Sequence, residues 1–388
     1  NVTEPRKETT KDAHISYLVT TTCGVSSLGA PQFTVRRRYQ DFSWLYTVLT
    51  AEFPQCIIAP PPEKHRIGYI TGDRFGDEFI EKRRAGLERF IRRIARHPLL
   101  QLNEHVKLFL TEPRLLHVEP NVPERDTLLD NIGDSILNAF SRIKHPDKRF
   151  IDVKETVEKF EDNLNAVERV YQKMTRREIE LHDDYLKFAK SVADLAQIET
   201  GMSDQFKQFA DTIEQFTAEM QRKTYTDEHS FVAQLREHMV YCQSVKGVLK
   251  LRDQKQVDYE ELAEYLHQQQ DERNKLQDAR GPTGLTSFIK GKYDEMKGVD
   301  AESARRQKID RLEEHIDELQ NAVNETHDVS TLFSREVLRE FNNFQTGKTL
   351  ELKEFLSEYA ESQADFYRKS ASLWEDLIPA LERLEVDD

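Results

Sequence analysis

Apolar residues recur at steps of three and four along almost the whole chain after residue 152, which is the period of an amphipathic α-helix. Two breaks interrupt this pattern, one at Gly201 and one at residues 280–284, which include two glycines and a proline. The pattern therefore predicts three long helices at about residues 152–199, 203–279 and 301–378, the last ending before Pro379. At a rise of about 1.5 Å per residue the first spans about 75 Å, so the three must pack along one another as a rod.

The apolar positions of these predicted helices are rich in phenylalanine and tyrosine, which favours a thick three-helix core over a thin two-stranded coiled coil. Three helices of this length leave apolar surface unburied within one chain, so we expect a dimer. One charged residue, Glu178, occupies an apolar position of the first helix. Glu178 and the uneven charge of the chain leave room for a different partner chain as well as for a second copy.

The first 115 residues show another pattern, that of a compact α+β domain. Residues 14–21 and 32–36 are rich in β-branched and aromatic residues, as strands are. Amphipathic stretches predict helices at residues 42–53, 77–96 and 103–110, the second ended by His97-Pro98. Between the first two helices, the run Pro60-Pro61-Pro62 predicts an extended loop, because proline has no backbone donor.

Residues 116–149 connect the two parts, and prolines punctuate their beginning. An amphipathic helix is expected at about residues 126–144. Such a helix packs on a neighbouring helix or lies in the interface of a membrane, and the sequence leaves both interpretations open. Its apolar face holds Leu129, Ile132, Ile136, Leu137 and Phe140.

The net charge of −14 is unevenly spread, with +5 on residues 1–115 and −19 on the remainder. Only the first part is therefore expected to meet an anion through its overall field. No apolar run reaches the length of a membrane-spanning helix and no signal peptide is recognisable, so we expect any membrane contact to be peripheral. The three cysteines, at positions 23, 56 and 242, are far apart, which fits a reducing compartment and no structural zinc site.

Motifs that carry catalysis are missing from the sequence: it has no HExxH, no GxSxG and no phosphate-cradling glycine loop. His182-Asp183-Asp184 resembles a ligand cluster, but on a helix these side chains point in different directions. We therefore expect no enzyme activity, no cofactor and no metal. A lipid-modifying or lipid-transfer enzyme is the rival from another class, and the lack of a nucleophile–base pair argues against it.

Three consecutive arginines, Arg36-Arg37-Arg38, precede Tyr39 at the end of the second predicted strand. A guanidinium fork matches phosphate oxygens, and an aromatic face can lie against a sugar-like ring. The pattern suits an anionic ring that bears phosphates, although basic triplets are more often solvated surface. Near residues 281–298 a second basic stretch is either a flexible hairpin or a contact with an anionic surface; its lysines are Lys290, Lys292 and Lys297.

These pieces resemble a known family. The run from Arg37 to Phe42, the proline loop with Lys64, and the run from Phe79 to Arg83 resemble the phox-homology (PX) domain of sorting nexins. The whole chain resembles the PX-BAR sorting nexins, most of all the autophagy-linked branch of the fungal ones. The resemblance implies a multidomain fold: an α+β PX domain (1–115) with a small antiparallel sheet, a linker with an amphipathic helix (116–149), and an all-α three-helix BAR coiled-coil domain (150–388).

For the PX part the resemblance implies a pocket for phosphatidylinositol 3-phosphate. Arg38 would bind the 3-phosphate, Tyr39 would lie against the inositol ring, Lys64 would bind the 1-phosphate, and Arg83 the 4- and 5-hydroxyls. A membrane-inserting loop would carry Ile67, Tyr69 and Ile70. The chain departs from the family pattern at Ala59 and Pro61, which puts the shape of the proline loop in question.

For the whole protein the resemblance implies a non-enzymatic, peripheral membrane protein of endosomes, with a link to the pre-autophagosomal structure. It would sense or remodel curved membranes in cargo retrieval and autophagy-linked trafficking, as a homodimer or with another PX-BAR sorting nexin. No nucleic-acid partner is expected. The alternative is a PX-anchored coiled-coil scaffold that binds protein partners without shaping the membrane.

Overall fold

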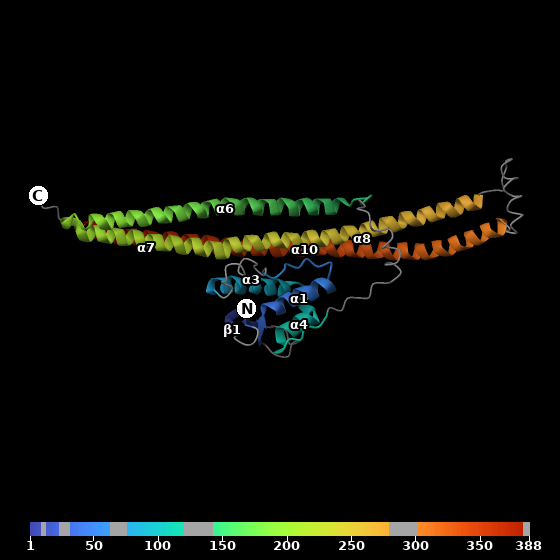
Figure 1. The fold of residues 1–388 in the computed structure, drawn as a ribbon, viewed down its shortest axis with the longest axis horizontal. Helices are drawn as coiled ribbons and strands as arrows, with labels where there is room; N and C mark the ends of the chain where they lie inside the picture. Colours follow the sequence, from blue (N-terminus) through green and yellow to red (C-terminus); the bar gives the residue numbers. More distant parts are fainter. Residues whose placement is uncertain (9–12, 23–31, 63–75, 120–142, 279–300, 383–388) are drawn as a thin grey trace.

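The computed structural model describes residues 1–8, 13–22, 32–62, 76–119, 143–278 and 301–382. Within them a small α+β unit, the N-terminal unit, lies against the middle of a long helical rod (Figure 1). The N-terminal unit comprises the strands β1 (Val2–Glu8), β2 (His14–Thr22) and β3 (Gln32–Arg38), the helices α1 (Tyr39–Glu52), α3 (Asp77–Arg96) and α4 (Glu104–Thr111), and a 3₁₀ turn (Leu100–Leu102).

The three strands form one antiparallel sheet in the order β1-β2-β3. Val19 pairs with Val2 on one side and with Val35 on the other, and all three side chains are buried. The helices cover the apolar face of the sheet, and the core between them is aromatic. Phe42 of α1 lies edge-on to Phe90 of α3 and to Phe109 of α4, which ties the three helices together. The prediction of an α+β domain is confirmed.

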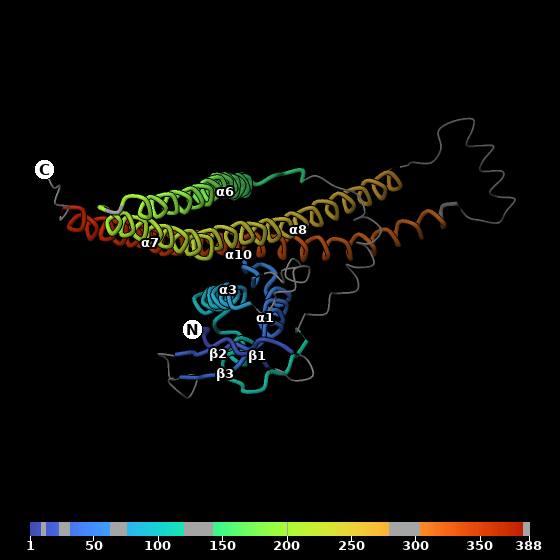
Figure 2. The backbone as a smooth tube through the Cα atoms, turned by 60° about the vertical axis from the view of Figure 1, so that its left-hand side comes forward, coloured from blue at the N-terminus to red at the C-terminus, as the bar shows by residue number. Residues whose placement is uncertain are grey.

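The rod consists of α6 (Lys148–Leu195), α7 (Ser203–Asp227), α8 (Ala233–Asp278) and α10 (Ala301–Glu382), with a short 3₁₀ turn (Thr200–Met202) before α7. A π-helical turn (Glu228–Val232) joins α7 to α8, so these two form one nearly continuous helix. The prediction of three long helices is confirmed, and the break near Gly201 lies where the first ends. In both views α6 begins near the middle of the rod, while α8 and α10 continue beyond it as a two-helix arm (Figures 1 and 2).

Apolar side chains from all the rod helices form its core where the helices overlap. Val157 of α6, Leu249 of α8 and Val337 of α10 belong to one buried cluster. In the two-helix arm a second cluster, with Leu266 and Leu319, holds α8 to α10. No helix among the described residues is long and apolar enough to cross a bilayer.

One expectation from the sequence needs correction. Pro379 does not end the last helix, because α10 continues to Glu382; the proline removes one backbone hydrogen bond, and only three residues of the helix follow it. Glu178, the charged residue at an apolar position of the first predicted helix, is paired within the chain: Lys223 Nζ of α7 lies 2.7 Å from one of its oxygens and the Thr224 hydroxyl donates to the other. The charge at this apolar position is thus neutralised within the chain.

Candidate functional site

Arg38 and Tyr39 stand where β3 passes into α1. Arg38 is the last residue of the strand and Tyr39 the first of the helix. The Asp41 carboxylate accepts a hydrogen bond of 2.8 Å from the Arg38 backbone amide, and its other oxygen lies 3.6 Å from Arg38 Nε. This local contact fixes the turn, while 42% of the Arg38 side chain remains exposed. Its guanidinium is therefore available to an anion at the strand end.

The other two arginines of the triplet serve the fold. Arg36 donates to the hydroxyl of Ser16 and to the backbone carbonyl of Glu4, which ties the three strands together. Arg37 is buried and donates to the carbonyls of Leu108, Phe109 and Glu112 at the C-terminal end of α4. The last carbonyls of a helix have no partner within it, so Arg37 acts as a side-chain cap for α4.

Arg83 of α3 lies between two aromatic rings. Its guanidinium carbon is 4.8 Å from the ring centre of Tyr39 and 4.2 Å from that of Phe79. This stacking holds the guanidinium plane by cation–π attraction. Its Nε is buried and has no hydrogen-bond partner among the described residues. An unpaired buried donor is costly, so Arg83 Nε is a donor that the described part of the chain leaves available to an acceptor.

Tyr39 also holds the proline loop. Its hydroxyl donates a hydrogen bond of 2.8 Å to the carbonyl of Pro62. Gly86 permits the loop to lie close on α3, because a Cβ there would come within 3.0 Å of Pro62 Cγ. Ala59 and Pro61, the two departures from the family pattern, are buried in this arrangement. The loop is thus packed on α3 at its described end, two residues before Lys64.

The structure brings together Arg38, Tyr39 and Arg83, because the strand end and α3 meet at the Tyr39 ring. The remaining residues predicted for sites lie outside the described residues, and their roles stay predictions. These are Lys64, the loop residues Ile67, Tyr69 and Ile70, the amphipathic-helix residues Leu129, Ile132, Ile136, Leu137 and Phe140, and the lysines Lys290, Lys292 and Lys297.

The opposite side of α3 faces the rod and forms a junction of ion pairs with it. Arg89 contacts both carboxylate oxygens of Glu237 on α8, at 2.5 and 2.8 Å. Arg93 binds Glu351 on α10 in the same two-pronged way, at 2.8 and 2.9 Å. Paired guanidinium–carboxylate contacts are among the strongest hydrogen bonds in proteins. One helix therefore presents Arg83 on one side and is fixed to the rod by the other.

The ion pairs of this junction were not predicted from the sequence. The basic side of α3 was visible in the sequence, but its acidic partners come from helices more than a hundred residues later. Ile57, just before the proline loop, belongs to the apolar core of the rod and contributes a further contact.

Cys56, His97 and Glu340 also meet at the junction, and their ligand atoms lie within 4.8 Å of one another. Such a trio could hold a metal ion, but its hydrogen bonds oppose this. His97 Nδ1 accepts from the backbone amides of Leu99 and Leu100, so the ring proton is on Nε2 and is donated to Glu340 at 2.8 Å. Burial, followed by the charge of Glu340, raises the pKa of the Cys56 thiol far above its usual range. His97 Nε2 is thus a hydrogen-bond donor to the buried Glu340 carboxylate.

The other rod helices leave an apolar face of α6 about half exposed. Its side chains are as hydrophobic as those of the core. They recur at steps of three, four and seven, so they share one side of the helix. Exposed apolar side chains gathered on one side of a helix are typical of an interaction surface. The residues are Val167, Val170, Met174, Leu181 and Phe188.

Comparisons with known proteins cover both parts of the chain. Residues 27–113 match the model of the PX domain family, and residues 125–284 match a family described as Vps5 C terminal like. Sorting nexin-4 of Cryptococcus neoformans is 37% identical over 399 residues, which covers 100% of this chain and 81% of that protein. Sorting nexin-4 of Aspergillus fumigatus is 37% identical over 404 residues, covering 98% and 81%.

Among solved structures, the fold is similar to that in the cryo-EM structure of the SNX-BAR Mvp1 tetramer, with a TM-score of 0.61. The match covers 97% of this chain and 99% of that one at 19% identity, so it bears on the fold alone.

Proposed function

The chain belongs to the sorting nexins that join a PX domain to a BAR-like domain, and from this premise we propose that it binds phosphatidylinositol 3-phosphate in membranes. Residues 1–115 would be the PX domain, 116–149 a linker with the amphipathic helix, and 150–388 the BAR domain. The protein would have no catalytic activity and would act through binding.

The arrangement of Tyr39 and Arg83 carries this proposal. A guanidinium stacked on an aromatic ring, with a buried and unpaired Nε, offers donors to ring hydroxyls beside a flat apolar surface for the ring itself. Arg38 adds an exposed guanidinium from the adjoining residue for a phosphate. Lys64 would complete the pocket at the 1-phosphate, and Ile67, Tyr69 and Ile70 would enter the bilayer beside it.

The second part of the proposal is a dimer through the rod. The exposed apolar face of α6 would be covered by a second copy or by another sorting nexin of this kind. One headgroup pocket is a weak anchor, but two on a rigid dimer bind with much higher avidity, because the second site binds intramolecularly. Lysines near an anionic leaflet add about 1 kcal/mol each, which is the role we propose for Lys290, Lys292 and Lys297.

In the cell, such a dimer would act peripherally on endosomal membranes, in cargo retrieval and in autophagy-linked trafficking. Sorting nexin-4 relatives that match along the whole chain support this assignment. A rod that recognises curvature would favour tubules over flat membrane. The alternative is a PX-anchored scaffold whose rod binds proteins without shaping the membrane.

Vesicle flotation tests the lipid specificity. The wild-type chain should float with vesicles that contain phosphatidylinositol 3-phosphate and remain unbound with vesicles that carry the 4-phosphate isomer at equal charge. Equal binding to both would show that charge alone attracts the protein. Electron microscopy of the same vesicles separates the two candidate functions, since only the curvature-shaping protein forms tubules. Reversing the charge of Lys290, Lys292 and Lys297 should abolish those tubules.

A further inference from the structure

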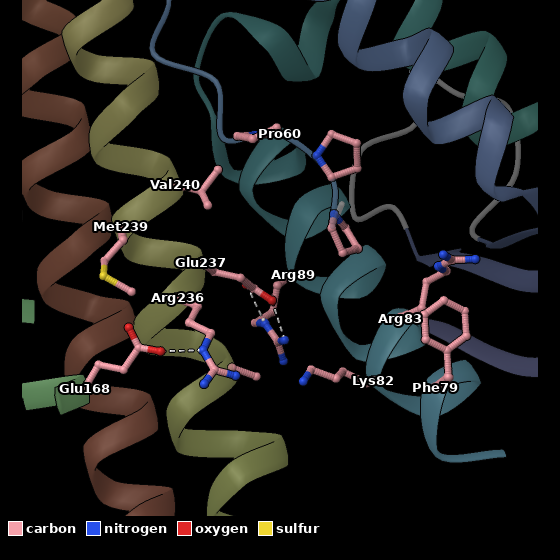
Figure 3. A pocket seen from close by; sticks show the side chains of 13 residues that line it. Pro60, Phe79, Lys82, Arg83, Arg89, Glu168, Arg236, Glu237, Met239 and Val240 are labelled. Atoms are coloured by element: carbon pink, nitrogen blue, oxygen red, sulfur yellow. Dashed lines mark hydrogen bonds and ion pairs between the residues drawn. The ribbon is translucent and has the colours of Figure 1, made fainter. Parts of the chain in front are cut away.

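A cavity of about 380 Å³ lies at the junction between the N-terminal unit and the rod. Its walls come from the proline loop and α3 on one side, and from α6 and the start of α8 on the other (Figure 3). Neither Arg38 nor Tyr39 lines it, so it is not the proposed headgroup pocket. Arg83 is the one residue of the described headgroup trio that also reaches this cavity.

Both domains contribute apolar residues to the wall. Ligand sites occur preferentially at such domain interfaces, with apolar walls and a few polar groups that fix orientation. The π-helical turn ends immediately before Ala233, the first α8 residue in the wall, and π turns inside helices are frequent at functional sites. The apolar lining residues are Pro60, Pro61, Pro62, Phe79, Ala233, Met239 and Val240.

The side chains that line the cavity carry an excess of positive charge. Both carboxylates are already paired: Glu168 lies 2.6 Å from Arg236, and Glu237 binds Arg89. Two cations of the wall, Lys82 and Arg83, have no carboxylate partner among the described residues. Figure 3 shows the Lys82 side chain extending from α3 toward the rod, beside the Arg89–Glu237 pair. An occupant of this cavity is therefore expected to carry a negative charge close to an apolar group.

We propose that this junction cavity binds a short acidic peptide segment of a partner protein, with an aromatic or aliphatic anchor side chain against the prolines and its carboxylate on Lys82. The cavity has room for a few side chains, and apolar anchors beside a charge are typical of peptide recognition. An inositol headgroup fits poorly, because its hydroxyls would lose water against seven apolar residues. An acyl chain fits poorly too, because ion pairs interrupt the apolar wall. The site adds a protein-docking function to the proposed lipid binding and does not depend on it.

A selection from randomised heptapeptides on the immobilised full chain, without lipid, tests the proposal. Selected peptides should combine aspartate or glutamate with a neighbouring aromatic or aliphatic residue. Fluorescence anisotropy with the strongest peptide should show binding to the wild-type chain and roughly tenfold weaker binding to Lys82→Glu, since a charged hydrogen bond is lost and repulsion is added. Lys107→Glu is the matched control, because Lys107 is an exposed lysine of α4 outside the cavity.

Val240→Trp supplies a second variant that fills the cavity without changing charge. It should also abolish peptide binding, whereas Val329→Trp on the exposed surface of α10 should not. The proposal is overturned if no acidic peptide is selected, or if selected peptides bind the Lys82→Glu and Val240→Trp variants as tightly as the wild type. It is equally overturned if vesicles of anionic lipid, and not the acidic peptides, occupy the cavity in competition assays. Retained vesicle binding by Val240→Trp would show that the lipid site is intact and separate.

Discussion

Arg93 of α3 binds Glu351 of α10 across the junction, with Nη2 2.8 Å from one carboxylate oxygen. Both side chains are largely buried, at 11% and 17% exposure. Because α3 also carries Arg83, this pair fixes the orientation of the proposed headgroup pocket on the rod. The buried pair therefore holds the N-terminal unit and the rod together.

Removing Glu351 should release the N-terminal unit from the rod. In Glu351→Ala a buried guanidinium loses its main partner, which costs about 3 kcal/mol in the free energy of unfolding. Urea denaturation and limited proteolysis between the domains measure the effect. Glu354→Ala is the control, because Glu354 and its partner Arg96 are both more than half exposed and contribute little. Equal stability of the two variants would contradict the role of the buried pair.

His238 of α8 lies 3.4 Å from the Glu351 carboxylate at the junction. Its protonation should be the first event that weakens the junction as the pH falls. Burial, and then the positive charge of Arg93, lower the pKa of His238 below its ordinary value of 6.5. The unfolded chain then binds this proton more readily than the folded one, so stability is complete above about pH 6.5 and falls as the pH drops below it. Urea denaturation at several pH values measures this step. His238→Gln should remove it, and an unchanged step in that variant would show that another group is responsible.

A second acid step should come from Glu340 and Glu351. Burial alone would raise the pKa of each carboxyl, but hydrogen bonds and charge interactions, led by those with His97 for Glu340 and with Arg93 for Glu351, together outweigh it and lower both pKa values below 4.5. Their contribution is complete above about pH 4.5 and is lost as the pH falls through the lowered values. Proteolysis between the domains should accelerate in this range. A junction that stays closed at pH values well below 4 would contradict the pairing.

Phe79 is expected to position Arg83 for the lipid. In Phe79→Ala one of the two stacking rings is lost, which should weaken binding to vesicles with phosphatidylinositol 3-phosphate about fivefold, equivalent to about 1 kcal/mol. Vesicle flotation at several lipid concentrations measures the change. Phe79→Tyr keeps the ring and should bind as the wild type does. If both variants bind equally, stacking on this ring does not orient Arg83.

The apolar face of α6 should be the dimer interface. The double variant Val170→Asp/Leu181→Asp places two charges in that face and should yield monomers at micromolar concentration, because an unpaired buried charge is costly. Light scattering after size-exclusion chromatography measures the mass. Lys190→Asp, an exposed position on another side of α6, should leave the oligomer unchanged. A monomeric wild type, mixed with no other nexin, would instead point to a hetero-partner.

The sequence was sufficient for features that depend on local pattern. The period of apolar residues gave the three long helices, and the strand end predicted where Arg38 and Tyr39 would lie. It was insufficient where a side chain meets a distant partner. The contacts of Arg37 with the end of α4 could not be predicted, because its partner carbonyls lie more than seventy residues away. In the sequence nothing distinguishes Arg93 from the other basic residues of its helix, because its partner Glu351 lies 258 residues later.

Arg38→Ala is the sharpest test of whether the strand-end arginine and the aromatic-stacked Arg83 form a phosphoinositide pocket. Its side chain is half exposed and its backbone contact with Asp41 is retained, so the variant should fold normally. Flotation with vesicles containing phosphatidylinositol 3-phosphate should then show binding reduced to the level of vesicles without it. Arg114→Ala, an equal loss of charge at an exposed position, should bind as the wild type does. If Arg38→Ala binds those vesicles as well as the wild type, the pocket lies elsewhere.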